Sequence, residues 1–76
     1  MKTFKEIIEL WENVPALVAD LNLNIDKTVM VHRIHKWKRR DWIPAEYWSS
    51  LLVSAKKRKI SITSTDLIET AAKKLV

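Results

Sequence analysis

Cysteine and glycine are both absent from the 76-residue sequence. A chain without cysteine forms neither disulfides nor thiolate-ligated zinc sites, and nothing in it indicates an oxidising compartment. A chain without glycine contains no P-loop and no glycine-rich dinucleotide-binding turn, because those loops need backbone conformations that glycine adopts at little cost. The missing residue types therefore exclude disulfide-stabilised secreted domains and the common nucleotide-binding motifs.

Long hydrophobic runs are absent as well. No apolar segment approaches the ~18 residues that a transmembrane helix needs, and the first residues form an acidic amphipathic pattern instead of a secretory leader. A length of 76 residues allows one domain at most, and contents of 47% hydrophobic and 30% charged residues are typical of a globular protein. We therefore expect one domain over residues 1–76, located in the cytoplasm and without a membrane partner.

Positive charge is concentrated in the middle of the chain. Residues 27–59 contain ten lysines and arginines against two acidic residues, whereas residues 1–26 contain two lysines against five acidic residues. A positive field of this density favours binding to a polyanion, although a solvated lysine-rich surface would give the same composition.

Capping signals and apolar stripes predict an all-α fold, a compact bundle of about five helices. Thr3 and Glu6 form a capping box, and Asn13 can cap a second helix. The segment from Thr63 to Asp66 is another capping signal. The five expected apolar stripes are Phe4, Ile7, Ile8 and Trp11; Val14, Leu17, Val18 and Leu21; Met30, Ile34 and Trp37; Tyr47, Trp48, Leu51, Leu52 and Ala55; and Leu67, Ile68, Ala71, Ala72 and Leu75.

The third helix is expected to be the longest, over about residues 25–40. No helix breaker occurs in this range, and Ile43-Pro44 is expected to end the helix, because the residue before a proline is pushed out of the helical region. Pro44 can then start the fourth helix. Asn22 suits a left-handed turn between the second and third helices. A short helix, an asparagine-bearing turn and a basic helix follow one another in the order of a helix-turn-helix.

Two segments carry a resemblance to a known family. Leu17-Val18-Ala19-Asp20-Leu21-Asn22-Leu23 resembles the Leu-Ala-x-x-Leu-Gly-Val motif of Cro and lambda-repressor-like phage domains. Residues 34–48, Ile-His-Lys-Trp-Lys-Arg-Arg-Asp-Trp-Ile-Pro-Ala-Glu-Tyr-Trp, are similar to the Val-x-x-Trp-Lys-x-Arg-x-x-Ile-Pro-x-x-Tyr-Trp block of small Cro-like prophage regulators of alpha-proteobacteria. The segments 7–11 and 62–67 match the ends of the same family. The resemblance implies a lambda-repressor-like, DNA-binding transcription regulator that acts as a homodimer.

The chain departs from this family at three places. Asn22 replaces the usual turn glycine, and Val18 replaces a small alanine that lets the two motif helices approach closely. Eleven positions separate Leu23 from Ile34, where the family usually has about five. The additional residues would lengthen the N-terminal end of the recognition helix by up to ~9 Å if they are helical. The register of the family's base contacts therefore does not transfer to this chain.

Helical geometry gives a second route to the DNA-contacting residues. At ~100° per residue, Met30, Ile34 and Trp37 define the inward face of the third helix. The side chains within about 50° of the opposite direction are polar or cationic, and we expect them to face the bases: Thr28, His32, His35, Lys36 and Arg39. Four further cations are expected to contact the phosphate backbone: Lys27, Arg33, Lys38 and Arg40.

Metal and enzyme chemistry are not expected. His32 and His35 have a spacing that can bind a metal, but zinc needs three or four ligands and the neighbouring cations would repel it. Ser49, Ser50 and Ser54 have no general base in their sequence pattern, and no Ser/His/Asp arrangement is present. We therefore expect no metal, no cofactor, no small-molecule substrate and no enzymatic activity.

The tryptophans and a lysine-rich segment leave alternatives open. Trp11, Trp37 and Trp48 lie on apolar stripes and are expected in the core. Trp42 falls before Pro44 and is expected either to cap the core or to form a self-association contact. The segment 56–59, Lys-Lys-Arg-Lys, is either a solvated helix end or a second contact to the DNA backbone.

The sequence therefore favours a sequence-specific regulator that binds double-stranded DNA. We expect it to act as a homodimer in the cytoplasm, associated with the nucleoid, with the helix at about 25–40 in the major groove. The alternative is a basic helical module that docks on an acidic protein. A third, weaker hypothesis is non-specific nucleoid binding.

Overall fold

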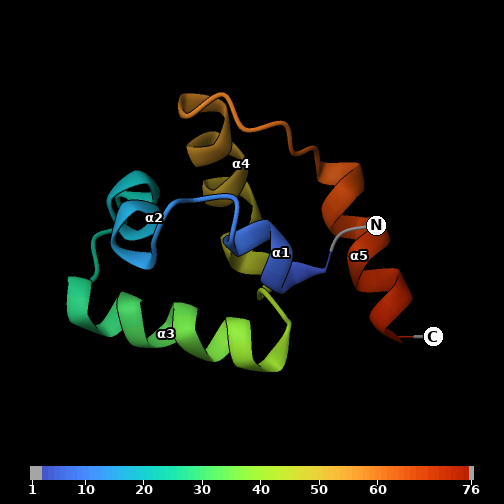
Figure 1. Ribbon diagram of the computed structural model, residues 1–76, viewed down its shortest axis with the longest axis horizontal. Coiled ribbons are helices and arrows are strands. Elements are labelled where there is room, and N and C mark those ends of the chain that lie inside the picture. Colours follow the sequence, from blue (N-terminus) through green and yellow to red (C-terminus); the bar gives the residue numbers. More distant parts are fainter. Residues whose placement is uncertain (1–2, 76) are drawn as a thin grey trace.

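The computed structural model describes residues 3–75, and the regular secondary structure of this part of the chain is all helical, with no strand (Figure 1). Its elements are α1 (Phe4–Ile8), α2 (Val14–Leu21), α3 (Lys27–Arg40), a 3-10 turn η1 (Ala45–Tyr47), α4 (Trp48–Lys57) and α5 (Ser64–Leu75). The predicted all-α bundle of about five helices is confirmed.

The predicted capping residues start three of the helices. Thr3 Oγ1 accepts a hydrogen bond from the Glu6 backbone N–H at 3.1 Å and donates one to Glu6 Oε1 at 3.3 Å. Asn13 Oδ1 accepts from the Ala16 N–H at 2.8 Å, which starts α2. Ahead of α5, the Thr63 N–H donates to Asp66 Oδ2 at 2.9 Å and the Asp66 N–H donates to Thr63 Oγ1 at 3.2 Å, a complete capping box.

Three helices end on a residue in the left-handed conformation, although the chain has no glycine. Asn22, Asp41 and Lys59 have φ values of 47°, 55° and 59°. The prediction for Asn22 is confirmed. The other two end α3 and α4 and were not predicted. After α3, the Trp42 N–H donates to the Trp37 carbonyl at 3.1 Å, and after α4 the Ile60 N–H donates to the Ala55 carbonyl at 2.8 Å. These are the bonds of Schellman motifs, in which glycine is the usual left-handed residue.

The predicted bounds of the third and fourth helices need correction. α3 begins at Lys27, not at about residue 25, because the Asp26 carboxylate caps it. It ends at Arg40 through the left-handed Asp41, so Ile43-Pro44 does not end it. Pro44 starts η1 and not an α-helix, and α4 begins only at Trp48.

All five apolar stripes contribute residues to one core. The predicted inward residues Met30, Ile34 and Trp37 are buried, and so is Trp11. Trp42 is half-buried and meets the Phe4 ring edge-on, with ring centroids 5.1 Å apart, so it caps the core. Trp48 stacks on the same Phe4 ring, with ring centroids 6.2 Å apart. Self-association is therefore not needed to account for Trp42.

The predicted inward face of α5 is partly wrong. Leu67 and Ala71 are buried, whereas Ile68, Ala72 and Leu75 are exposed, with Ile68 58% and Leu75 77% accessible. Thr70 takes the remaining inward position, where its hydroxyl donates to the Asp66 carbonyl at 2.6 Å. The apolar stripe of α5 is broader than the surface that it covers, so only two of its five residues are buried.

The helices are arranged so that α3 lies along one edge of the molecule. α2 packs against both α3 and α4, α1 packs against α3, and α5 contacts α4. In Figure 1, α2 is seen nearly end-on while α3 runs across the view, so the two helices cross instead of lying side by side. The C-terminal end of α4 lies on the side of the molecule away from α3. No helix within residues 3–75 has both the length and the apolar character needed to cross a membrane.

Candidate nucleic-acid interface

The long helix α3 is held by one face only. Met30, Ile34 and Trp37 form its buried seam, and they are 2%, 0% and 7% exposed. The rest of the helix is open to solvent or only half covered. Because the seam is narrow, more than half of the circumference of α3 is free to contact another molecule.

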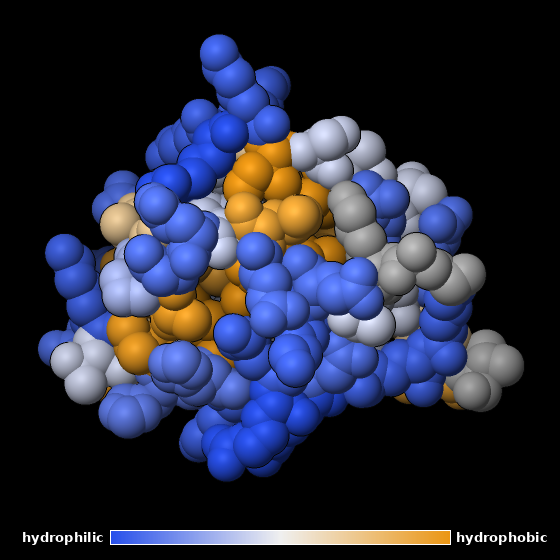
Figure 2. All heavy atoms as spheres, in the orientation of Figure 1, coloured by the Kyte–Doolittle hydropathy of each residue, from blue (hydrophilic) through white to orange (hydrophobic). Residues whose placement is uncertain are grey.

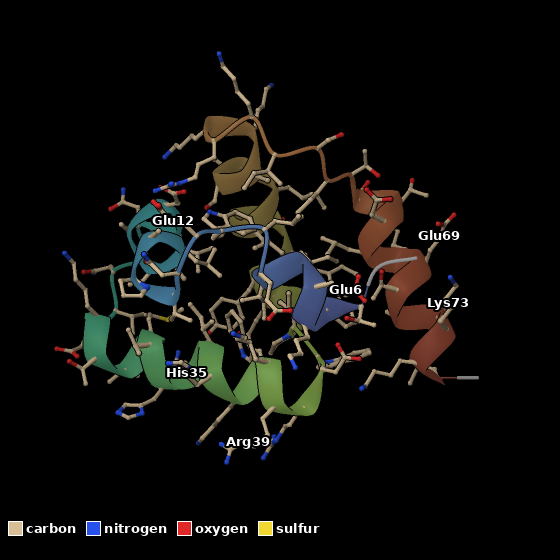
Figure 3. The ribbon with its side chains drawn as sticks, in the orientation of Figure 1. Glu6, Glu12, His35, Arg39, Glu69 and Lys73 are labelled. Carbon is tan, nitrogen blue, oxygen red and sulfur yellow. The ribbon has the colours of Figure 1, made fainter. Side chains whose placement is uncertain are left out.

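The five residues predicted to face DNA bases all lie on the open side of α3, and all are exposed: Thr28, His32, His35, Lys36 and Arg39. In Figure 3, Arg39 extends from the side of α3 that points away from α1 and α2. Figure 2 shows that the edge of the molecule formed by α3 is hydrophilic along most of its length. The structure therefore brings these residues together on one polar, cationic surface.

An aspartate lies at each end of this surface, and each of the two makes hydrogen bonds within the protein. Asp26 Oδ1 accepts from the backbone N–H groups of Thr28 and Val29 at 2.9 and 3.2 Å. Asp41 Oδ1 accepts from the Lys5 N–H at 2.9 Å, and its Oδ2 lies 3.5 Å from Lys74 Nζ. Because Asp26 occupies the N-terminal amides of α3, these amides do not form an anion site.

The four residues predicted to contact the phosphate backbone have different surroundings. Lys27 and Arg40 are exposed. Lys38 is half-buried and lines a shallow hollow together with Glu9 and Glu12, on the α1 side of α3. Lys38 is therefore less open to solvent than Lys27 and Arg40, and it lies on a different side of α3 from Arg33.

Arg33, the fourth of these residues, is exposed but not free. Its Nη1 donates a hydrogen bond of 2.8 Å to the hydroxyl of Tyr47. The Tyr47 ring is half-buried and lies against Trp37, with ring centroids 4.7 Å apart. Tyr47 had been assigned only to the core, so its place beside the basic surface was missed. The signal was present in the motif that joins Trp37 to Tyr47, but the sequence does not say how the intervening turn folds.

A second basic segment, residues 56–59, lies away from α3, at the C-terminal end of α4 (Figure 1). Within it, Arg58 binds Asp20 through Nε and lies 3.4 Å from Glu12 Oε1 through Nη1. This hydrogen bond from Arg58, joined by one from the Trp11 indole, holds the pKa of the Asp20 carboxyl below its ordinary value. Part of the positive charge of this segment is therefore neutralised locally by Asp20 and Glu12.

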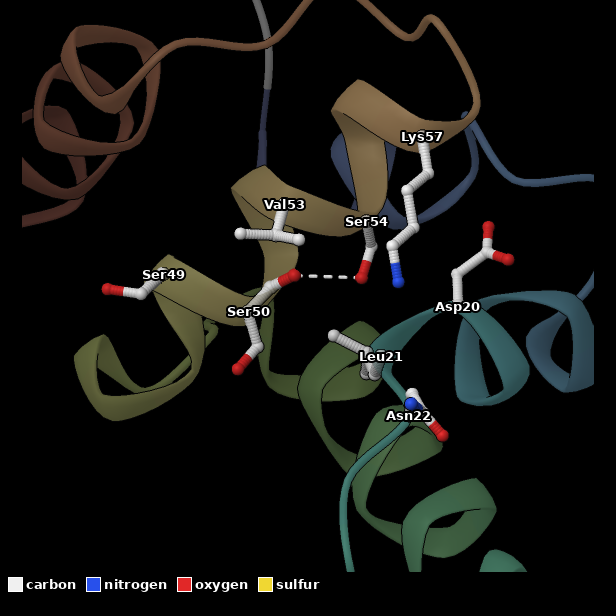
Figure 4. Close-up of a pocket in the computed structure, with 8 residues that line it drawn as sticks. All are labelled: Asp20, Leu21, Asn22, Ser49, Ser50, Val53, Ser54 and Lys57. Carbon is white, nitrogen blue, oxygen red and sulfur yellow. Dashed lines mark hydrogen bonds between the residues drawn. The ribbon is translucent and has the colours of Figure 1, made fainter.

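A surface hollow of about 250 Å³ separates the end of α2 from α4 (Figure 4). Ser49, Ser50, Asn22 and Lys57 are among the residues that line it. Ser54 Oγ donates back to the Ser50 carbonyl at 2.8 Å. Both histidines belong to α3 and not to this hollow, so its serines have no imidazole base for nucleophilic chemistry.

Metal-ligating residues do not gather anywhere in the part of the chain that the structure describes. Over residues 3–75, no three His, Cys, Asp or Glu side chains are placed to hold a metal ion. His32 and His35 are instead exposed on the open face of α3, where an imidazole can hydrogen-bond to another molecule.

No protein-family model, curated protein or solved structure significantly matches this chain.

Proposed function

We propose that the protein binds double-stranded DNA sequence-specifically, with α3 in the major groove. One observation carries this proposal. The face of α3 opposite its buried seam is continuous, exposed and built from His, Lys, Arg and Thr. A major groove is wide enough for one α-helix, and these side chains supply the donors that the base edges and phosphates accept.

The support that α3 receives from the rest of the fold suits this role. α2 crosses α3 and packs on its seam, as the first helix of a helix-turn-helix does. α3 has 14 residues, which corresponds to about 21 Å of helix, so it can span several base pairs. Both of its ends are fixed by side-chain or backbone bonds, so its exposed side chains start from a rigid element.

Different sides of α3 would contact the bases and the phosphate backbone. Arg39 and His32 lie most directly opposite the seam and are placed to reach base edges. Arg33 and Arg40, seven residues apart, lie together on the flank next to η1, where the phosphate wall of a groove would run. Thr28, His35, Lys36 and Lys27 complete the interface.

The resemblance to small Cro-like prophage regulators supports a role in transcription regulation inside the cytoplasm. Such a regulator acts as a homodimer, which would place two α3 helices about 34 Å apart on an inverted repeat. No part of this role requires a cofactor, a metal or an enzymatic step.

A selection on random duplexes, followed by affinity measurements over a range of salt concentrations, tests the proposal. We expect enrichment of one motif, and an affinity for it that exceeds the affinity for random duplex at every salt concentration. Equal affinities for all duplexes would indicate non-specific nucleoid binding. No affinity for any duplex would favour the docking of the basic surface on an acidic protein.

A further inference from the structure

We infer that Tyr47 and Arg33 form one phosphate-binding site, in which Tyr47 is the positioning residue that holds the Arg33 guanidinium against the DNA backbone. This inference rests on the proposed function and deepens it. It adds a residue outside the recognition helix to the interface and assigns that residue a chemical task.

The hydrogen bond between the two side chains carries the inference. Arg33 Nη1 donates to Tyr47 Oη at 2.8 Å, while Arg33 itself is exposed. An exposed arginine otherwise samples many rotamers and loses that freedom when it binds. A guanidinium already tied to a tyrosine loses less, and four of its five N–H donors remain for a ligand.

The Tyr47 hydroxyl can itself take part in binding. It accepts the bond from Arg33, so its own O–H remains to donate. Within residues 3–75 that O–H has no acceptor. A guanidinium and a phenolic O–H less than 3 Å apart are two donors aimed at one place, which suits the several acceptor oxygens of a phosphate.

The turn before α4 is built so that Tyr47 reaches Arg33. The Trp48 indole N–H donates to the Ile43 carbonyl at 2.8 Å, and the Tyr47 N–H donates to the Pro44 carbonyl at 3.0 Å. These bonds fix the shape of the turn over residues 43–48, and the Trp37 and Tyr47 rings lie against each other with centroids 4.7 Å apart. The Ile-Pro-x-x-Tyr-Trp segment therefore folds into a turn that holds the Tyr47 side chain next to α3.

The ligand is the sugar-phosphate backbone and not a base. Tyr47 belongs to η1, beside α3, and Arg33 lies on the flank of α3, close to its buried seam. With the opposite face of α3 in the groove, this flank meets the groove wall, where phosphates are the exposed acceptors. Arg40 shares this side of α3 and adds positive charge to it.

A double-mutant cycle with Tyr47→Phe and Arg33→Gln tests this inference. The readout is the Kd for a random-sequence duplex and for the duplex recovered by selection, measured over a salt series. Tyr47→Phe keeps the ring on Trp37 and removes only the hydroxyl. We expect it to weaken binding to both duplexes by about tenfold, or about 1.4 kcal/mol, and to make the log Kd against log salt slope shallower by nearly one phosphate contact, about 0.9.

The double variant separates a joint site from two independent contacts. If Tyr47 acts through Arg33, Tyr47→Phe weakens binding much less in the Arg33→Gln background than in wild type, so the double variant binds about as weakly as Arg33→Gln alone. Lys73→Gln on α5 removes the same charge far from Arg33 and should leave both Kd and slope near the wild-type values. Equal melting temperatures for wild type and Tyr47→Phe show that the fold is intact.

The results that overturn the inference differ from those that overturn the proposed function. If wild type binds duplex DNA and Tyr47→Phe has the wild-type Kd and salt slope, the inference is wrong while the proposed function stands. Additive losses with an unchanged slope in Tyr47→Phe also overturn the joint site. If wild type binds neither duplex, the proposed function and this inference fall together.

Discussion

The indole N–H of Trp11 donates a hydrogen bond of 2.9 Å to Asp20 Oδ2, and the same oxygen accepts one from Arg58 Nε. Trp11 is buried just after α1, Asp20 lies near the end of α2, and Arg58 follows α4. One carboxylate thus joins three parts of the chain that are far apart in the sequence. Its side chain is 17% exposed, so the two bonds are only partly screened by water.

This carboxylate predicts how stability depends on pH. The Arg58 hydrogen bond, and to a lesser extent the Trp11 bond, lower the pKa of Asp20 in the folded protein. A folded pKa below the unfolded one stabilises the fold above the ordinary pKa of an aspartate, about 3.9, and this contribution is lost as pH falls through the folded pKa. Asp20→Asn should therefore be less stable than wild type at pH 7, and the difference should shrink below about pH 4.

Urea denaturation at a series of pH values measures this difference. Glu69→Gln, an exposed carboxylate on α5, is the matched control and should follow the wild-type curve throughout. A gap between Asp20→Asn and wild type that stays constant down to pH 2 would show that the bonds of Asp20 do not depend on its charge.

Lys59→Gly should raise stability. Lys59 is exposed and has a φ of 59°, a conformation that costs an L-residue about 1–2 kcal/mol. Glycine removes this cost, but its greater freedom in the unfolded chain lowers the free energy of unfolding by about 0.5–1 kcal/mol. We therefore expect the free energy of unfolding to rise by a net of about 0.5–1 kcal/mol. In a domain of this size 1 kcal/mol raises Tm by about 4–8 °C.

The control for this variant is Lys56→Gly, three residues earlier and inside α4. Glycine in a helix costs up to about 1 kcal/mol, so this variant should melt below wild type. If both lysine variants lower Tm, the left-handed conformation of Lys59 carries no strain that glycine relieves.

Trp37→Ala should remove a large share of the stability of the domain. Trp37 is 7% exposed, belongs to the seam of α3 and supports the Tyr47 ring. Truncation of a buried aromatic costs about 3–5 kcal/mol, out of a total of about 4–11 kcal/mol for a chain of this length. Leu75→Ala, at 77% exposure, should stay within about 0.5 kcal/mol of wild type. Similar melting curves for Trp37→Ala and wild type would mean that the seam is assigned to the wrong face.

The helix starts were predictable from the sequence because capping is local. Thr3 and Glu6, or Thr63 and Asp66, lie within four residues of each other, and their bonds depend on little else. The end of α3 was not predictable in this way. Asp41 takes a left-handed conformation while its carboxylate binds the backbone of Lys5, 36 residues away. A hydrogen bond between residues so far apart in the sequence depends on how the helices pack, and no sequence pattern near Asp41 predicts it.

The basic surface was largely predictable, and its edges were not. Helical periodicity gave the open face of α3 correctly because Met30, Ile34 and Trp37 admit only one inward direction. α5 has apolar residues around a wider arc, and packing selected Leu67 and Ala71 but not Ile68. Tyr47 was missed because it reaches α3 through a turn whose shape depends on the Trp48 and Pro44 bonds.

Arg40→Gln should weaken DNA binding without changing sequence preference. Arg40 is exposed on the flank of α3, on the same side as Arg33. If it contacts one phosphate, its removal makes the slope of log K against log salt shallower by about 0.9 and lowers affinity equally for selected and random duplexes. The measurement is a salt series on both duplexes, with Lys73→Gln as the distant control. An unchanged slope would remove Arg40 from the interface.

Arg39→Ala should change the sequence preference, in contrast to the substitution of the adjacent Arg40. Arg39 extends from α3 directly away from the core, where a side chain meets base edges instead of the groove wall (Figure 3). An arginine fork pairs best with guanine O6 and N7, so its loss should cost about 1–3 kcal/mol against the selected duplex and relax the preference at one base pair. A second selection with the variant reads this out as one position that becomes degenerate. The two neighbouring arginines therefore orient α3 in the groove. If Arg40→Gln loses the preference at a base pair and Arg39→Ala weakens binding to all duplexes equally, α3 is rotated by about 100° from the orientation proposed here.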